Sequence, residues 1–136
     1  MYSNHILSIE DNQRDVALMK RIFKKHIPEY NLMHICDGEE AISYLESESF
    51  KLALPKLILL DIKIPKLDGL EILKRFRAYK EYLNIPVVIF SSSDLKKDIK
   101  EAYEIGANSF LEKPKSYLEL SKTLPVLIEY WIVYNK

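Results

Sequence analysis

Acidic side chains, a hydroxyl and an ammonium follow short apolar runs at four separate places in this sequence. Two acids are adjacent, and a third comes directly after the wholly apolar run 57–60. A serine ends the run 86–91, and a lysine follows the run 108–112. In sequence order these residues are Glu10, Asp11, Asp61, Ser91 and Lys113. If the runs are neighbouring strands, all five side chains meet at one edge of a sheet.

Three carboxylates that meet at one site repel one another unless a cation lies among them. An oxygen-only ligand set suits Mg²⁺, which takes a few carboxylates and completes its coordination with water and substrate phosphate. Lys113 and Ser91 would then face an anion from the opposite side. The pattern predicts phosphoryl transfer, in which the metal and Lys113 neutralise charge while a carboxylate attacks as the nucleophile.

The apolar runs alternate with helical patterns along the whole chain. Strands are predicted at residues 5–9, 31–36, 57–61, 86–91 and 108–112. Helices are predicted at 13–26, after the capping box of Asp37 and Glu40, at 70–79, at 94–105, and after the box of Ser116 and Glu119. Five strands, each followed by a helix, predict an α/β fold with a parallel sheet covered on both faces. Ligands of such sheets bind beyond the carboxyl ends of the strands, which is where the five residues lie.

Local signals refine the predicted helices and loops. Asp68 and Glu71 form a further capping box, and Gly106 is predicted to end the helix 94–105 in a left-handed conformation. Ser93 or Asp94 is the predicted cap at the start of that helix. The segment 47–56 is the longest predicted loop.

Composition places the chain among ordinary globular proteins. It has 136 residues, the length of one domain, with 48% apolar and 29% charged residues. A formal net charge of +0 argues against nucleic-acid binding as its main function. The N-terminus lacks the features of a secretory signal, and no apolar run is long enough to cross a membrane. We therefore expect a cytoplasmic protein that binds neither nucleic acid nor membrane directly.

Cys36 is the only cysteine, so no internal disulfide can form. A single cysteine suits a reducing compartment. Because Cys36 lies in a predicted strand, we expect it to be a small buried apolar residue.

Taken together, these motifs resemble the receiver domain of two-component response regulators. The resemblance rests on Glu10-Asp11, on Asp61 within D-x-x-x-P-x-x-D-G, on Ser91 after an apolar strand, and on Lys113-Pro114. It implies a three-layer, doubly wound sheet of five parallel strands in the order 2-1-3-4-5 with five helices. It also implies a single receiver domain over residues 1–136 with no output domain. Segments such as IEDNQRDVALMK and LILLDIKIPKLDG are most similar to stand-alone regulators that serve bacterial phytochromes.

The resemblance implies a role for each matched residue. Asp61 would accept a phosphoryl group from a sensor histidine kinase. A phytochrome-type kinase is one candidate. Asp11 would bind Mg²⁺ directly, Glu10 through water, and Lys63 through its backbone carbonyl. Ser91 would bond a phosphoryl oxygen, and Lys113 would pair with the phosphate. The peptide bond between Lys113 and Pro114 would be cis.

Two positions depart from the usual receiver pattern. Phe110 occupies the place of an aromatic switch residue but lacks a hydroxyl, so packing alone would hold its rotamer. Lys63 lies two residues after the acceptor, where many relatives have a neutral or acidic side chain. We hypothesise that Lys63 alters the lifetime of the phosphorylated state.

The C-terminal segment PVLIEYWIVY is apolar nearly all round, although a surface helix should have one polar face. Pro125 is expected to kink the helix by removing one hydrogen bond. Surplus apolar surface often marks an association site. We favour a homodimer formed through residues 94–105, 108–112 and the last helix over a tail that only covers its own core.

Four functions remain open on the sequence alone. The first is a single-domain response regulator that signals by protein contact or by onward transfer to a phosphotransfer domain, and that catalyses only its own phosphorylation and dephosphorylation. An aspartyl-phosphate hydrolase would want a second Asp in the place of Lys63. A flavodoxin-like cofactor carrier would want a loop rich in Ser, Thr or Gly where Glu10 and Asp11 stand. A receiver that serves only as a docking module would not need the complete acidic set.

Overall fold

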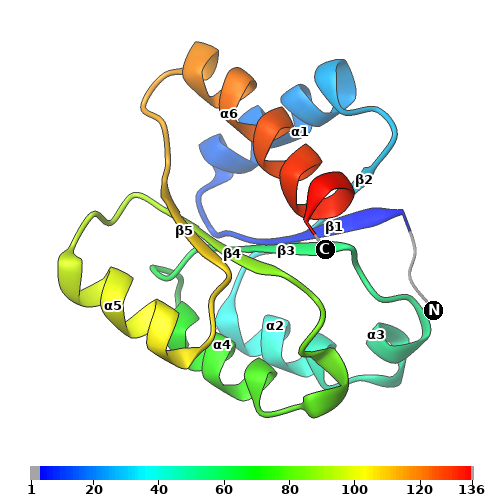
Figure 1. Cartoon of the computed structure of the whole chain (residues 1–136), viewed down its shortest axis with the longest axis vertical. Helices are drawn as coiled ribbons and strands as arrows, with labels where there is room; N and C mark the ends of the chain where they lie inside the picture. The colour runs from blue at the N-terminus through cyan, green and yellow to red at the C-terminus, as the bar shows by residue number, and fades with distance from the viewer. Residues whose placement is uncertain (1–3, 136) are drawn as a thin grey trace.

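The computed structural model of the chain describes residues 4–135 and contains a parallel sheet of five strands. The strands are β1 (His5–Ile9), β2 (Asn31–Ile35), β3 (Leu57–Leu60), β4 (Val87–Ser91) and β5 (Ser109–Glu112). Their order across the sheet is β2-β1-β3-β4-β5, so the predicted order is confirmed. The carboxyl ends of the strands gather on the left-hand side of Figure 1.

Helices cover both faces of the sheet and complete the three layers (Figure 1). Helices α1 and α6 lie on one face, and α2, α3, α4 and α5 lie on the other. Their bounds are α1 (Gln13–His26), α2 (Gly38–Leu45), α3 (Glu48–Leu52), α4 (Gly69–Arg77), α5 (Lys96–Ile105) and α6 (Tyr117–Glu129). A 3₁₀ turn, Lys80–Tyr82, follows α4, and a π-helical turn, Tyr130–Tyr134, follows α6.

The hydrophobic core has two parts, one on each face of the sheet. Strand β3 contributes to both, because all four of its residues are buried. Its apolar sequence without alternation is therefore explained by helices on both sides. On α1 the buried residues recur at helical spacing, as Val16, Met19, Ile22 and Phe23.

The segment 47–56, predicted as a loop, contains the short helix α3. Ser47 caps it, since the Ser47 hydroxyl accepts a hydrogen bond from the Phe50 backbone N–H at 3.2 Å. Phe50 is fully buried and packs edge-on against Phe76 and Tyr82. The predicted number of five helices is therefore wrong, because a helix of five residues is too short to show helical periodicity.

The start of α5 and the place of Cys36 also differ from prediction. Helix α5 begins after Leu95, which has no side-chain cap, so neither Ser93 nor Asp94 is the capping residue. Ser93 instead accepts a hydrogen bond from the Leu95 N–H and donates one to Asp98. Cys36 is exposed rather than buried, because β2 ends one residue earlier at Ile35.

Arg77 connects the end of α4 to the start of β4 and to the end of α5. Its guanidinium donates hydrogen bonds to the backbone carbonyls of Gly106 at 2.9 Å, Tyr82 at 3.1 Å and Ile85 at 3.0 Å. It also donates to the side-chain oxygen of Asn108 at 2.7 Å, and the same oxygen accepts from the Val87 N–H. The left-handed cap predicted at Gly106 is confirmed by its φ of 128°.

Helix α6 continues through Pro125 to Glu129 before the π-helical turn. Leu127 and Ile128 are buried in the core, whereas Val126 is 67% exposed and Tyr130 is 50% exposed. The apolar C-terminal segment therefore covers the protein's own core with one face and leaves another apolar face on the surface.

Candidate functional site

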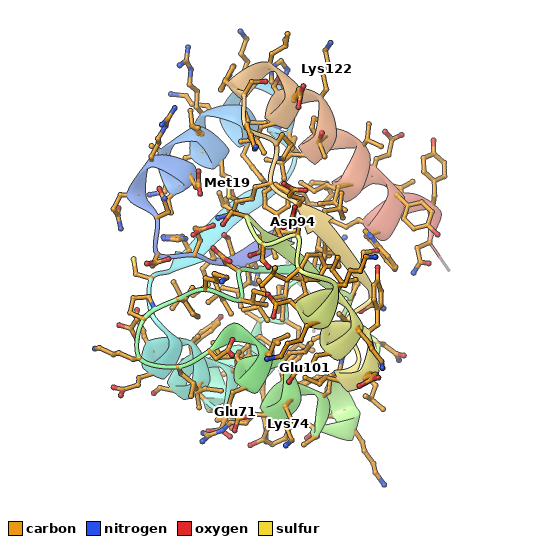
Figure 2. The ribbon with its side chains drawn as sticks, turned by 90° about the vertical axis from the view of Figure 1, so that its left-hand side faces the viewer. Met19, Glu71, Lys74, Asp94, Glu101 and Lys122 are labelled. Atoms are coloured by element: carbon orange, nitrogen blue, oxygen red, sulfur yellow. The ribbon has the colours of Figure 1, made fainter. Side chains whose placement is uncertain are left out.

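The candidate residues lie where the strands end, on the side of the molecule that faces the viewer in Figure 2. In that view Asp94, in the loop after β4, lies between Met19 of α1 above and Glu101 of α5 below. Parallel pairing of β1 with β3 and of β3 with β4 aligns the ends of these strands. The structure thus brings distant segments of the chain to one edge, as the strand pattern predicted.

Asp61 follows the last residue of β3 and is only 5% exposed. Its backbone N–H donates to the carbonyl of Ile9, which extends the pairing of β3 with β1 by one residue. Asp61 Oδ1 accepts a hydrogen bond from the Lys63 N–H at 3.1 Å, and Oδ2 lies 3.0 Å from Lys113 Nζ. The carboxylate is therefore held in place by a strand, a turn and a cation.

Gly69 allows α4 to begin directly against the backbone of Asp61 and Ile62. A Cβ at this position would lie 2.3 Å from the Asp61 carbonyl oxygen and 2.5 Å from Ile62 Cα. Because backbone atoms cannot move aside as a flexible side chain can, a glycine is required here. Gly69 is therefore more than a turn residue: it sets how closely α4 approaches Asp61.

Glu10, Asp11 and Asp61 form the acidic cluster that the sequence predicted. One carboxylate oxygen from each lies within 4.8 Å of the others, a spacing that suits shared ligation of one cation. Glu10 is 2% exposed, and its Oε2 accepts a hydrogen bond from the Asn12 N–H at 3.1 Å. These three oxygen donors fit a divalent ion such as Mg²⁺.

Burial raises the pKa of Glu10 to about 7, and the negative charge of Asp61 adds to the rise. The hydrogen bond from Lys113 acts in the opposite direction and lowers this pKa. A raised pKa in an acid means that its negative charge is poorly compensated where it stands. Further positive charge would therefore stabilise the acidic cluster.

Lys113 is the cation that reaches the cluster. Its side chain is 9% exposed, and its Nζ contacts carboxylate oxygens of Glu10, Asp15 and Asp61. The Lys113 backbone N–H donates to the Ser91 carbonyl at 2.8 Å, so pairing with β4 fixes where the side chain starts. Burial alone would lower the pKa of Lys113, but the bonds to Glu10 and Asp15 and the charge of Asp61 raise it above its ordinary value.

Ser91 ends β4 and is completely buried. Its hydroxyl accepts a hydrogen bond from the Ser93 N–H at 3.3 Å and so belongs to the loop between β4 and α5. Ser91 is one strand away from Asp61, since β3 and β4 are paired neighbours. A bond from Ser91 to a phosphoryl group would therefore couple that loop to events at Asp61.

The roles expected of Lys63 as a metal ligand and of Phe110 as a switch residue stay predictions. The Lys63 side chain is exposed, and its backbone N–H, as described above, is bound to Asp61. Phe110 is half-buried against the core on the α2–α5 face, and its N–H donates to the Tyr103 hydroxyl at 3.0 Å. Neither the metal-ligand role of the Lys63 carbonyl nor the rotamer switch of Phe110 follows from these contacts alone.

The prediction of a cis peptide bond before Pro114 is wrong. No peptide bond among residues 4–135 is cis. The expectation came from the family resemblance alone, and no feature of the residue pattern required it.

Sequence reasoning missed one residue of the site, Asp15. It lies in the first turn of α1, and its Oδ2 is 2.9 Å from Lys113 Nζ. A signal was present, because the capping residue Asn12 begins a helix directly after the acidic pair and brings the first turn of α1 close to the site. Beside this contact, a cavity of about 330 Å³ separates α1 from the segment between β5 and α6.

Comparisons with known proteins agree with this geometry. Residues 6–124 match the family described as the response regulator receiver domain, so the end of α6 and the π-helical turn lie beyond the match. The probable methanogenesis regulatory protein FilR2 of Methanothrix harundinacea is 34% identical over 96% of this chain and 85% of its own length.

Two further response regulators are similar over nearly the whole chain. The response regulator Rcp1 of Synechocystis is 30% identical over 93% of this chain and 88% of its own length. The structure of its Mn²⁺-bound form has a TM-score of 0.82 and covers 98% of both chains. The phosphorylated cyanobacterial phytochrome response regulator RcpA has a TM-score of 0.89 at 30% identity, covering 98% of this chain and 96% of its own.

Proposed function

Because this chain belongs to the response regulator receiver domain family, we propose that it takes a phosphoryl group from a sensor histidine kinase onto Asp61. The observation that carries the proposal is the meeting of three carboxylates and one lysine at the end of β3, with Asp61 in contact with Lys113. The phosphorylated protein then signals by contact with a downstream protein or by passing the phosphoryl group to a phosphotransfer domain.

Asp61 is the nucleophile of the proposed transfer. One of its carboxylate oxygens forms a bond to phosphorus while the N–P bond of the kinase phosphohistidine breaks, and the imidazole keeps that bonding pair. Lys113 holds an ammonium 3.0 Å from the attacking group, where it can bind a phosphoryl oxygen. Ser91 supplies a hydroxyl to another phosphoryl oxygen and draws the loop after β4 towards the site.

Glu10, Asp11 and Asp61 are the residues that would hold Mg²⁺, together with the backbone carbonyl of Lys63. When bound, the ion neutralises charge on the acids and on the incoming phosphoryl oxygens. The separation of the carboxylate oxygens, within 4.8 Å, supports this assignment, as does the existence of an Mn²⁺-bound form of the relative Rcp1.

Intact mass measurement tests the phosphoacceptor directly. Incubation with Mg²⁺ and acetyl phosphate is expected to add one phosphate to the native protein and none to Asp61→Asn. Chelation of the metal with EDTA should prevent the addition. A phosphate that the Asp61→Asn variant also acquires would refute the assignment.

We propose that the protein catalyses only its own phosphorylation and dephosphorylation and does not turn over free phosphoesters. Lys63 stands where a phosphatase of the aspartyl-phosphate type would need a second carboxylate, and its charge has the wrong sign for a general base. Assays with p-nitrophenyl phosphate should give no release of nitrophenol above the Asp61→Asn background, and multiple turnover would contradict this part of the proposal.

Similarity to RcpA, which is a cyanobacterial phytochrome response regulator, supports a phytochrome-type histidine kinase as the phosphodonor. Mixing the protein with autophosphorylated kinases should give faster transfer from a phytochrome kinase than from an unrelated one. Equal transfer from both would leave the kinase class without support.

We further propose a homodimer that uses α5, β5 and α6. An apolar groove next to β5 is lined by residues that include Leu111, Val126, Tyr130 and Trp131. Sedimentation at micromolar concentration should detect dimers of the native protein and fewer dimers of Val126→Glu. Leu52→Glu is a matched control, because Leu52 is 70% exposed on the distant helix α3. A strict monomer with and without phosphate would contradict the dimer.

None of the helices in the described part of the chain has the length and apolar character needed to span a bilayer.

A further inference from the structure

Lys113 is bound by a carboxylate that has no part in the proposed phosphoryl transfer. Asp15 Oδ2 lies 2.9 Å from Lys113 Nζ, as close as Asp61 Oδ2 at 3.0 Å. Asp15 comes from α1 and is not a member of the acidic cluster at the strand ends. Its presence at this lysine therefore needs its own explanation.

The start of α1 fixes the backbone of Asp15. The Asn12 side-chain oxygen accepts hydrogen bonds from the backbone N–H groups of Arg14 at 3.0 Å and Asp15 at 3.1 Å. The next residue, Val16, is buried. An acid in the first turn is also favoured by the positive end of the helix dipole. Asp15 is thus a fixed anchor rather than a mobile surface acid.

The number of donors on a lysine gives this anchor a function. An ammonium group has three N–H donors and no acceptor. In this structure the ammonium contacts three carboxylates, which belong to Glu10, Asp15 and Asp61. Two of the three come from residues that do not receive phosphate, so two donors can stay bound while the third changes partner.

We propose that Asp15 is a positioning residue which, together with Glu10, holds the Lys113 ammonium so that its third N–H points at residue 61. This inference rests on the proposed phosphorylation of Asp61. When an Asp61 oxygen forms its bond to phosphorus and the bond between phosphorus and the donor's leaving group breaks, Asp61 loses its negative charge. The third N–H then passes to a phosphoryl oxygen, while Asp15 and Glu10 keep the ammonium in place.

Asp15 could instead compete with the phosphoryl group for Lys113, and this role predicts the opposite change in the phosphorylation rate. If Asp15 only competed with the phosphoryl group for Lys113, its removal would release the lysine and speed phosphorylation. If Asp15 positions Lys113, its removal lets the ammonium move and slows phosphorylation. The sign of the change therefore decides between the two.

The first test measures the rate of Asp61 phosphorylation by acetyl phosphate in Mg²⁺. Asp15→Asn keeps the shape of the side chain and removes its charge, and we expect the rate to fall about tenfold, the usual effect of losing a charged hydrogen bond. In a Lys113→Ala background the same change should have no further effect, because Asp15 acts only through Lys113. Glu101→Gln is the matched control, since it removes one negative charge from the exposed face of α5 (Figure 2).

The second test needs neither metal nor phosphate. Reductive methylation with formaldehyde and cyanoborohydride, followed by peptide mass mapping, reports how freely each lysine side chain reacts. Lys113 should react several-fold faster in metal-free Asp15→Asn than in the native protein or in Glu101→Gln. Asp15→Glu keeps the charge and should protect Lys113 better than Asp15→Asn does, which separates positioning from loss of fold.

The outcomes are distinct for each claim. Equal or faster phosphorylation of Asp15→Asn overturns the inference, and so does an equal loss in the Lys113→Ala background. Unchanged labelling of Lys113 overturns it as well. Native protein that takes no phosphate on Asp61 refutes the proposed function instead, and the labelling then still decides whether Asp15 holds Lys113.

Discussion

Replacement of Lys113 by methionine should destabilise the metal-free protein strongly. The change keeps much of the side-chain volume and removes the charge of a side chain that is 9% exposed. This ammonium contacts two buried acids, whose side chains alone are 3% exposed for Glu10 and 6% exposed for Asp61. Loss of one partner from a buried ion pair costs about 3–5 kcal/mol, because the remaining charges stay buried without compensation. That is a large part of a total stability of about 5–15 kcal/mol.

Urea unfolding in EDTA measures this loss. With a slope of about 2 kcal/mol per molar urea, the midpoint of Lys113→Met should lie about 2 M below that of the native protein. Added Mg²⁺ should raise the midpoint of the variant more than that of the native protein, because the acids no longer have a competing cation. Lys63→Met is the control, since its side chain is exposed and surface changes usually stay within about 0.5 kcal/mol. Equal midpoints for the two variants in EDTA would refute the reasoning.

Three further substitutions probe the site and its support. Lys63→Asn should shorten the lifetime of phosphorylated Asp61 several-fold by exposing the phosphoryl group to water; equal dephosphorylation rates would end that hypothesis. Arg77→Lys should lower the free energy of unfolding by about 2–4 kcal/mol, because an ammonium cannot replace the forked bonds to three carbonyls, and an unchanged urea midpoint would contradict this. Gly69→Ala should cost at least about 1–3 kcal/mol and slow phosphorylation, since its Cβ would lie 2.3 Å from the Asp61 carbonyl oxygen; native stability and rate would show that α4 can simply move away.

The positions of the acidic residues relative to the strands could be predicted because parallel sheets have a simple geometry. Strand β3 is buried on both faces, so its sequence is apolar without alternation, and Asp61 could be assigned to its carboxyl end. The same reasoning placed Glu10 and Asp11 after β1 and Lys113 after β5. Strand order came from the family resemblance, since several orders would fit the same alternation of elements.

Features that depend on tertiary contacts could not be predicted. Helix α3 has five residues and is held by the burial of Phe50 among other aromatic rings, which no local pattern reveals. Cys36 is exposed because β2 stops one residue short of it. The contact of Asp15 with Lys113 joins residues 98 positions apart and depends on how α1 approaches the segment after β5.

Chemical trapping of the phosphorylated residue tests the central claim most directly. Borohydride reduces an aspartyl phosphate to homoserine and leaves a free carboxylate unchanged, so peptide mass mapping can name the residue that carried the phosphate. After treatment with Mg²⁺ and a phosphodonor, the account predicts homoserine at position 61 and at no other acid. Homoserine at position 11 or 15, or 2-amino-5-hydroxypentanoic acid at position 10, where the residue is a glutamate, would contradict it. So would the absence of any reduced residue in a protein that has gained the mass of a phosphate.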